Sequence, residues 1–326
     1  MTTYKEIRGT NIEAVASDPA NPVVGQVWYN TTSNVVKAFF NDPGSWATVN
    51  SMNTARRDTG GAGIATSALV FGGQPTPDKK DTELWNGTSW TAVNDLNFGR
   101  IEIAGAGASN TAVLAFGGIM DNVSDSTESW NGTNWTELNQ MSRPLPAMRH
   151  LGGAGVQTAA LAFGGGGPRE LTETWNGTNW TETADLNTGR NYLAGVGTNT
   201  AALAAGGNAP PGNTDETELW NGSSWTEVND LNTAKSKLAG SGQGTTTAAL
   251  VFGGSPYPVS KTNSEAWNGT NWTNVNGLNL GRGRLAGAGT KTSALAIGGI
   301  VPGSPNVTTA TELWNIGPAT VTFTDS

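Results

Sequence analysis

The sequence contains no cysteine and a single histidine, His150, among its 326 residues. Without thiols there are no disulfides, no thiolate metal ligands and no thiol redox chemistry, and one histidine cannot build a multi-histidine site. Structural zinc is excluded on this ground. We therefore expect neither a metal site nor a cofactor.

Charged residues are also sparse, at 13% of the chain, and the net charge is −8. Nucleic-acid affinity comes largely from clustered Lys and Arg, and no such cluster is visible. No run of about 18 apolar residues occurs, and the N-terminus lacks the apolar core of a signal peptide. These features predict a soluble protein that is not exported, does not insert into membranes and does not bind nucleic acid.

What the chain does have is a repeat. The motif T-E-L-W-N-G-T-S-W-T-A-V at 82–93 recurs along most of the sequence. A fixed period of about 45 residues indicates a repeat architecture. The copies open at tryptophans that are 45 to 47 residues apart: Trp85, Trp130, Trp175, Trp220, Trp267 and Trp314.

Each repeat predicts four short strands. A Gly/Ala-rich strand such as 193–198 comes first, then an apolar strand ending in Gly-Gly such as 68–73, then T-E-L-W, then W-T-E-V. Four antiparallel strands in about 45 residues are typical of a β-propeller blade, whose innermost strand must be poor in bulk. We therefore predict an all-β, six-bladed β-propeller.

The two tryptophans of each W-N-G-T-N-W turn are expected to be cross-strand neighbours, with Asn-Gly supplying the tight turn. A residue that recurs in every blade is better explained by packing than by sugar stacking. The same argument assigns the repeated glutamates, such as Glu83 and Glu128, to hydrogen bonding between blades.

The repeat is out of phase at its ends, which predicts how the ring closes. Trp46 belongs to a fourth strand that precedes the first complete repeat, and Trp314 has no tryptophan partner after it. We predict that residues 46–50 complete the last blade and so remove its free edge. The alternative is that the strand-like segment 320–324 supplies the closing strand.

The chain resembles the kelch repeat in three features: Gly-Gly after an apolar strand, a tryptophan beyond a variable loop, and an arginine that opens the next unit. The arginines are Arg56, Arg100, Arg149, Arg190 and Arg282. The resemblance covers residues 46–315, although tryptophan replaces the tyrosine usual in kelch repeats. Galactose-oxidase-like kelch enzymes need Cys, Tyr and His as copper ligands, and this chain has no Cys and only one His.

A second resemblance lies near the N-terminus. The segment G-Q-V-W-Y-N-T-T-S-N-V-V-K at 25–37 is similar to a segment common near the start of bacteriophage tail-fibre and other virion proteins. Residues 27–40 also read as a β-hairpin. We expect residues 1–45 to form an attachment segment, residues 46–315 the propeller, and residues 316–326 a C-terminal tail strand.

No catalytic motif stands out. There is no nucleophile elbow, phosphate loop or calcium-loop spacing. His150 would act as a general base only with an orienting partner, and the sequence identifies none, so we interpret it as an ordinary loop residue. We therefore predict no enzymatic activity and no catalytic residue.

Candidate binding residues come from the loops between the second and third strands, which differ in every blade. Divergent loops on a rigid scaffold are what a recognition surface requires, although neutral drift would look the same. The candidates are Asp78, Lys79, Lys80, Asp121, Arg169, Asp215, Tyr257 and Lys261.

Together these features predict a non-enzymatic virion protein, a tail fibre or a capsid or tail decoration, which binds other virion proteins through its N-terminal extension. Its propeller would contact the host surface or the particle, with a host glycan as one ligand. The alternatives are a glycan-binding lectin, and an intracellular kelch scaffold or a lyase or hydrolase that uses loop acids such as Asp121 and Asp215 around the axis. The ligand, host and oligomeric state are left open by the sequence.

Overall fold

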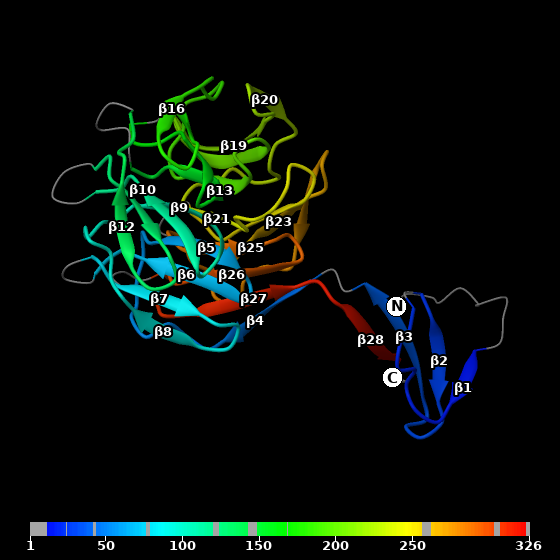
Figure 1. Ribbon diagram of the computed structural model, residues 1–326. Coiled ribbons are helices and arrows are strands. Elements are labelled where there is room, and N and C mark those ends of the chain that lie inside the picture. The colour runs from blue at the N-terminus through cyan, green and yellow to red at the C-terminus, as the bar shows by residue number, and fades with distance from the viewer. Residues whose placement is uncertain are drawn as a thin grey trace. The chain divides into compact units, whose positions relative to one another are not determined.

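The computed structural model describes residues 12–23, 25–41, 44–75, 79–119, 124–142, 149–167, 169–255, 262–302 and 307–323. All regular structure in these ranges is β-strand (Figure 1). None of the described segments is a helix capable of crossing a bilayer. The chain divides into two compact units, one of residues 45–315 and one that combines residues 1–44 with residues 316–326.

The larger unit holds six four-stranded antiparallel sheets within its described ranges, as predicted for the propeller. The first blade comprises β5 (Gly60–Ile64), β6 (Ser67–Phe71), β7 (Thr82–Trp85) and β8 (Trp90–Val93). The second comprises β9 (Ala104–Ser109), β10 (Ala112–Phe116), β11 (Thr127–Trp130) and β12 (Trp135–Leu138). The third comprises β13 (Gly152–Val156), β14 (Ala159–Phe163), β15 (Thr172–Trp175) and β16 (Trp180–Glu182).

The remaining blades follow the same order. The fourth comprises β17 (Ala194–Gly197), β18 (Ala202–Ala209), β19 (Gly212–Trp220) and β20 (Trp225–Val228). The fifth comprises β21 (Ala239–Gly240), β22 (Ala249–Phe252), β23 (Ser264–Trp267) and β24 (Trp272–Val275). The sixth comprises β25 (Ala286–Gly289), β26 (Ser293–Ile297), β27 (Thr311–Asn315) and β4 (Ser45–Val49).

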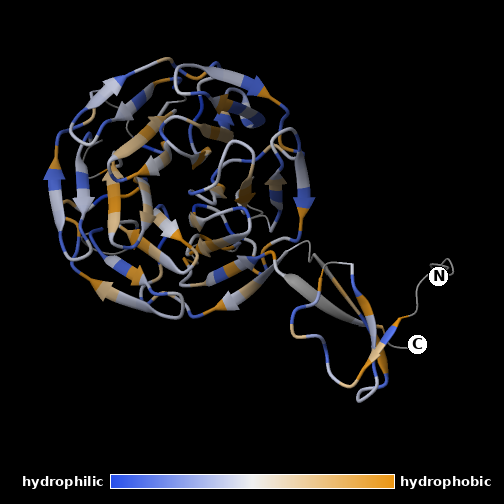
Figure 2. Cartoon of the chain, turned by 45° about the vertical axis from the view of Figure 1, so that its right-hand side comes forward, coloured by the Kyte–Doolittle hydropathy of each residue, from blue (hydrophilic) through white to orange (hydrophobic). Residues whose placement is uncertain are grey.

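The first strands of the six blades contact one another in a closed circle, β5–β9–β13–β17–β21–β25 and back to β5. Figure 2 shows the strands arranged around the central axis. The Gly/Ala composition of these strands is required by the convergence of the blades: a Cβ on Gly61 would lie 2.8 Å from the Cβ of Ala286 in the neighbouring blade. The second strands, such as β6 and β10, are almost completely buried, as their continuous apolar sequences predict.

The ring closes as predicted from the offset of the repeat. β4 pairs antiparallel with β27, and Trp46 lies opposite Trp314. The Trp46 ring also packs edge-on against Phe252 of the fifth blade, with ring centroids 4.8 Å apart. The alternative closing segment does not serve this purpose, because β28 (Pro318–Phe323) pairs with β3 (Val35–Asn41) in the smaller unit.

The paired tryptophans are structural residues. As predicted, they face each other across the third and fourth strands, for example Trp85 opposite Trp90. The indole N–H of the fourth-strand tryptophan donates to a Thr or Ser hydroxyl on the preceding blade's third strand, and six such bonds run around the propeller. They are Trp90 to Thr311, Trp135 to Thr82, Trp180 to Thr127, Trp225 to Thr172, Trp272 to Thr217 and Trp46 to Ser264.

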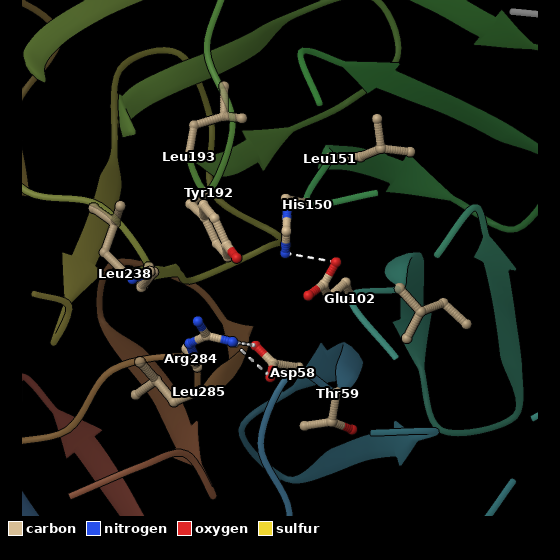
Figure 3. A pocket seen from close by; sticks show the side chains of 12 residues that line it. Asp58, Thr59, Glu102, His150, Leu151, Tyr192, Leu193, Leu238, Arg284 and Leu285 are labelled. Atoms are coloured by element: carbon tan, nitrogen blue, oxygen red, sulfur yellow. Dashed lines mark hydrogen bonds and ion pairs between the residues drawn. The ribbon is translucent and has the colours of Figure 1, made fainter. Parts of the chain in front are cut away.

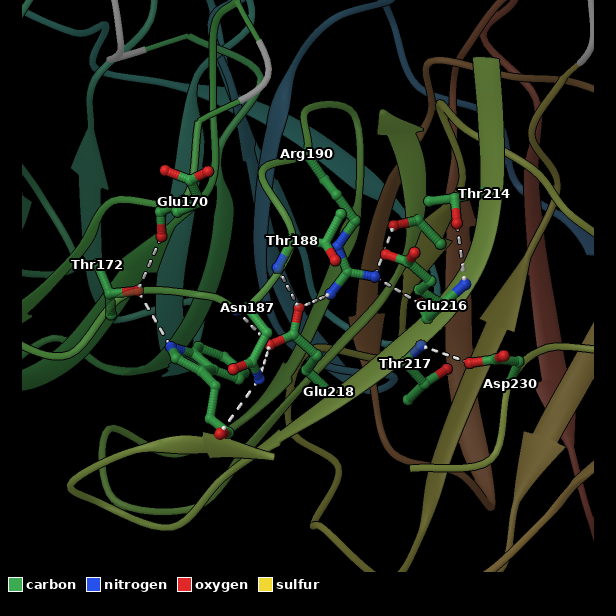
Figure 4. Close-up of polar contacts among 12 residues, drawn as sticks. Glu170, Thr172, Asn187, Thr188, Arg190, Thr214, Glu216, Thr217, Glu218 and Asp230 are labelled. Carbon is green, nitrogen blue, oxygen red and sulfur yellow. Dashed lines mark hydrogen bonds and ion pairs between the residues drawn. The ribbon is translucent and has the colours of Figure 1, made fainter. Parts of the chain in front are cut away.

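Buried ion pairs connect consecutive blades. The carbonyl of Arg100 accepts a hydrogen bond from Gly73 of the first blade, while its guanidinium lies 2.8 Å from Glu128 of the second. Figure 4 shows the equivalent group at Arg190 and Glu218, where the carboxylate also accepts the N–H of Asn187. The other described pairs are Arg56–Glu83, Lys235–Glu265 and Arg282–Glu312. The glutamates therefore join blades, as predicted.

Two assignments from the sequence need correction. The repeat cation in the fifth blade is Lys235, which a search for arginine alone misses. Arg149 does not occupy the repeat arginine position. In the second blade the repeat cation, Arg100, stands two residues before Glu102, and His150 is the equivalent of Glu102 in the third blade. The equivalent position in the third blade, 148, lies outside the described residues.

The smaller unit is a four-stranded sheet in the order β1 (Glu13–Val15), β2 (Val27–Asn30), β3 and β28. β2 and β3 form the hairpin predicted at 27–40. Trp28 is fully buried, and its indole N–H donates to Asp18 at 3.0 Å. Asp18 also accepts hydrogen bonds from Asn30 and Lys37, and these donors lower the pKa of its carboxyl to about 2.

Candidate functional site

A ring of six side chains surrounds one mouth of the propeller axis. In every blade the residue two positions before the first strand adopts a left-handed backbone conformation with φ of 55–57°. Such a conformation is uncommon for residues other than glycine, and its clustering at one place is a pointer to function. The six residues, called the axial ring below, are Asp58, Glu102, His150, Tyr192, Lys237 and Arg284.

The backbone of the axial ring is a closed circle of hydrogen bonds. The N–H of each member donates to the carbonyl of the preceding one: Glu102 to Asp58, His150 to Glu102, Tyr192 to His150, Lys237 to Tyr192, Arg284 to Lys237, and Asp58 to Arg284. The distances are 2.8–3.2 Å. Because this circle fixes the backbone of all six blades, the side chains can differ without altering the scaffold.

The side chains of the axial ring converge on one space. Figure 3 shows Asp58, Glu102, His150, Tyr192 and Arg284 directed toward a common pocket. This pocket has a volume of about 100 Å³, and apolar residues such as Leu193 and Leu285 line it below the ring. It is therefore an amphiphilic pocket with polar groups at its rim.

One ion pair on the ring is complete. The Arg284 guanidinium lies 3.0 Å and 3.2 Å from the two carboxylate oxygens of Asp58. Burial alone would lower the pKa of Arg284, but the neighbouring Asp58 carboxylate offsets it, so that the pKa stays above its usual value. Both charges are consequently neutralised within the ring.

His150 and Glu102 form the second contact. His150 Nε2 lies 2.6 Å from Glu102 Oε2, and the two side chains are only 8% and 10% exposed. The separation is that of an ion pair, but the alignment is poor, and neither atom has a well-directed hydrogen bond. Burial lowers the pKa of His150 and so favours the neutral imidazole, whereas Glu102 acts in the opposite direction.

Tyr192 lies between this contact and the cations. Its ring centroid is 3.5 Å from that of His150, and the Lys237 ammonium lies 5.2 Å from it on a cation–π contact. Burial raises the pKa of the Tyr192 phenol to about 12, so the hydroxyl remains protonated. It can donate a hydrogen bond to a ligand at any physiological pH.

Below the ring the axis continues as a shaft. The shaft is lined by glycine and alanine of the first strands and holds about 140 Å³. At its far end, beside Gln243, the cavity has a volume of only about 10 Å³. The shaft therefore presents its larger volumes toward the axial ring.

Gln243 closes the far end because the fifth blade has two additional residues there. Its side-chain amide donates to the carbonyl of Gly155 in the third blade at 3.0 Å, and its backbone N–H donates to Gly289 of the sixth blade. The carbonyl of the adjacent Gly242 accepts from Gly197 of the fourth blade. The insertion is thus a floor held by three other blades.

The candidate residues from the variable loops lie away from the axial pocket. Lys79, Lys80, Arg169 and Asp215 accept backbone hydrogen bonds from the connections to the next blade, for instance from Arg100 to Lys79 and from Leu231 to Asp215. They belong to three different blades, and none lines the pocket of the axial ring. The other four candidates, Asp78, Asp121, Tyr257 and Lys261, lie outside the described residues.

His150 does lie outside the strands, as expected of a loop residue, but Glu102 stands beside it as a partner that the sequence did not identify. The other five ring members were also missed. A signal was present: in each repeat the residue two before the Gly/Ala pair differs, as in D-T-G-G, E-I-A-G, H-L-G-G, Y-L-A-G, K-L-A-G and R-L-A-G. This position carries a different polar or charged side chain in each repeat, although the residues around it are nearly uniform.

In the part of the chain that the structure describes, no group of three or more His, Cys, Asp or Glu side chains is placed to hold a metal ion. The axial ring itself offers two carboxylates, two cations, a neutral imidazole and a phenol. They can hydrogen-bond and pair with charged groups of a small ligand.

Six four-stranded sheets around an axis, with functional side chains at one mouth, define a β-propeller protein. Among solved structures, the chain is similar to YjhT, with a TM-score of 0.65 over 81% of this chain and 96% of that one. The sequence identity is 15%, so the likeness is one of fold. No protein-family model and no curated protein sequence matches the chain.

Proposed function

We propose that the chain is a non-enzymatic recognition protein of a bacteriophage particle, a tail fibre or a capsid or tail decoration. The kelch-like propeller displays a binding face, and the unit of residues 1–44 and 316–326 attaches to other virion proteins. The phage setting rests on the resemblance of residues 25–37 to virion proteins. The display role rests on the distribution of variable residues in the propeller.

The observation that carries the display role is that the repeats diverge on one face. The loops between second and third strands and the connections that carry the axial ring emerge on the same face, where Arg57 and Gln74 join them by backbone hydrogen bonds. The turns on the opposite face repeat nearly unchanged, with Asn86 capping its own turn as Asn131 does. Divergence on one face of a rigid scaffold, beside uniformity on the other, is the pattern that a recognition surface requires.

A glycan-binding lectin that uses the variable loop face is the second candidate. The axial pocket, at about 100 Å³, is smaller than the roughly 300–1,000 Å³ of most ligand pockets and suits a smaller ligand than a glycan. The pocket combines an aromatic ring with charged hydrogen-bonding groups, a combination common in small-molecule sites. The two functions are compatible if the glycan belongs to a host surface.

Mass spectrometry of purified phage particles tests the proposed setting. We expect the chain to be present at a constant ratio to the major capsid protein and to be retained after density-gradient purification. Particles without it would overturn the virion role. A glycan array with the purified propeller tests the lectin role independently, and silence across the array would remove that candidate.

A further inference from the structure

The charges of the axial ring are segregated around the axis. The circle of backbone hydrogen bonds gives the order Asp58, Glu102, His150, Tyr192, Lys237, Arg284. The two acids are therefore neighbours, the two bases are neighbours, and Glu102 stands three positions from Lys237, on the opposite side of the axis. With a neutral His150 the six side chains carry no net charge.

Only part of this charge is compensated inside the ring. Asp58 pairs with Arg284 on the ring and also lies 3.6 Å from the Nε of Arg57 beside it. Among the described residues, Glu102 has one ion-pair contact, with the imidazole of His150, whose neutral form burial favours. For Lys237 the described residues provide no carboxylate within ion-pair distance, and its ammonium lies over the Tyr192 ring. The ring thus retains one negative and one positive group facing each other across the pocket.

We propose that the axial ring binds a small zwitterion of the α-amino acid class, with its ammonium group at Glu102 and its carboxylate at Lys237. The Tyr192 hydroxyl is placed between the two charges, and the backbone circle holds both in a fixed geometry. A pocket of about 100 Å³ admits a molecule of a few heavy atoms. This proposal rests on the binding role, and not on the phage setting, of the function proposed above.

The same arrangement disfavours ligands with a single charge. A simple anion placed at Lys237 would also meet the field of Asp58 and Glu102, and a simple cation at Glu102 would meet Lys237 and Arg284. A neutral dipolar ligand avoids both repulsions, which is how an array of opposite charges achieves specificity. Hydrogen bonds to charged groups contribute about 1.5–3 kcal/mol each, so losing either contact weakens binding about 10- to 100-fold.

Isothermal titration of the purified full chain tests the proposal with glycine and alanine as zwitterions and with acetate and methylammonium as single-charge probes. We expect saturable binding of the zwitterions and at least tenfold weaker binding of the other two. Glu102→Gln and Lys237→Met should each weaken glycine binding by tenfold or more. The matched controls Glu182→Gln, on the exposed outer strand β16, and Lys291→Met, between β25 and β26, should leave it unchanged.

Three results would overturn the proposal: no binding of either zwitterion to a folded protein, acetate or methylammonium binding as tightly as glycine, or undiminished glycine binding by both ring variants. Circular dichroism and thermal unfolding of each variant separate loss of binding from loss of fold. Presence or absence of the chain in phage particles does not bear on these outcomes, so the two proposals fail independently.

Discussion

His150 is joined to Glu102 twice, once through the backbone, where its N–H donates to the Glu102 carbonyl at 3.2 Å, and once through the side chains, 2.6 Å apart. The backbone bond belongs to the circle that holds the axial ring. The side-chain contact instead depends on the protonation state of the imidazole, which makes it sensitive to pH.

The lowered pKa of His150 predicts a loss of stability in mild acid. Burial favours the neutral imidazole in the folded chain, against Glu102 and Asp58, while the Arg149 charge acts in the same direction as burial. The unfolded chain therefore takes up the proton first, so this contribution is complete above about pH 6.5 and is lost as the pH falls toward the folded-state pKa. Denaturant unfolding at several pH values should show a smaller loss between pH 7.5 and 5.5 for His150→Gln than for the wild type. Equal slopes for the two proteins would contradict the assignment.

Replacing Trp46 by alanine should open the ring. Trp46 fills the space between Trp314 and Phe252, and its N–H donates to Ser264. Removing a buried tryptophan side chain costs about 3–5 kcal/mol. We expect a decrease of that size in the free energy of unfolding, measured by urea titration, and a smaller one for Trp46→Phe. An unchanged midpoint for Trp46→Ala would show that β4 is dispensable for closure.

The buried pair Arg100–Glu128 predicts an asymmetric double-mutant cycle. Both side chains are fully buried, and Arg100 also donates to the carbonyls of Gly117 and Ser126. Arg100→Met leaves the Glu128 carboxylate without its partner and should destabilise the fold by about 3–5 kcal/mol. Adding Glu128→Gln should recover part of this loss. Additive single effects, measured by denaturant unfolding, would contradict direct coupling between the two groups.

In the smaller unit, Asp18→Asn should weaken the contacts that hold Trp28, Asn30 and Lys37 together. The pKa of about 2 arises first from Lys37 and then from Asn30 and Trp28, so the carboxylate contributes its stabilisation above the unfolded-state pKa and loses it as the pH falls toward 2. The variant should shift the indole N–H resonance of Trp28 and make it insensitive to acid. Asp95→Asn, on the propeller, serves as a control that should leave this resonance in place.

Much of the fold follows from the sequence because the same strand pattern occurs in six copies of the repeat. The Trp85–Trp90 pairing, the Gly/Ala-rich inner strands and the closure through Trp46 were all deducible from the period and phase. The pairing of residues 318–323 with 35–41 was not, because a short alternating segment carries no information about its partner. Likewise the position of Arg149 was misjudged, because the third repeat has a longer connection that shifts the register.

The axial ring escaped prediction for a different reason. Its members, from Asp58 to Arg284, differ in residue type and charge. They share only a left-handed backbone conformation at the same position of each repeat. The loops that vary in length suggest a binding surface, whereas the residues that converge in space occupy the same position in every repeat. Chemical contrast between repeats at that fixed position is the signal that identifies the ring.

The closure of the sixth blade also constrains how the protein is made. β4 leaves the ribosome at the start of the propeller but has no partner until β27 follows, after more than 200 residues of intervening chain. At translation rates of about 5–20 residues per second, this strand waits for roughly 10–50 seconds. Five blades can assemble during that interval, each from contiguous sequence, whereas the sixth must wait until synthesis is nearly finished. Truncated chains should therefore expose an unpaired strand at each side of the gap, and such unpaired edges promote aggregation.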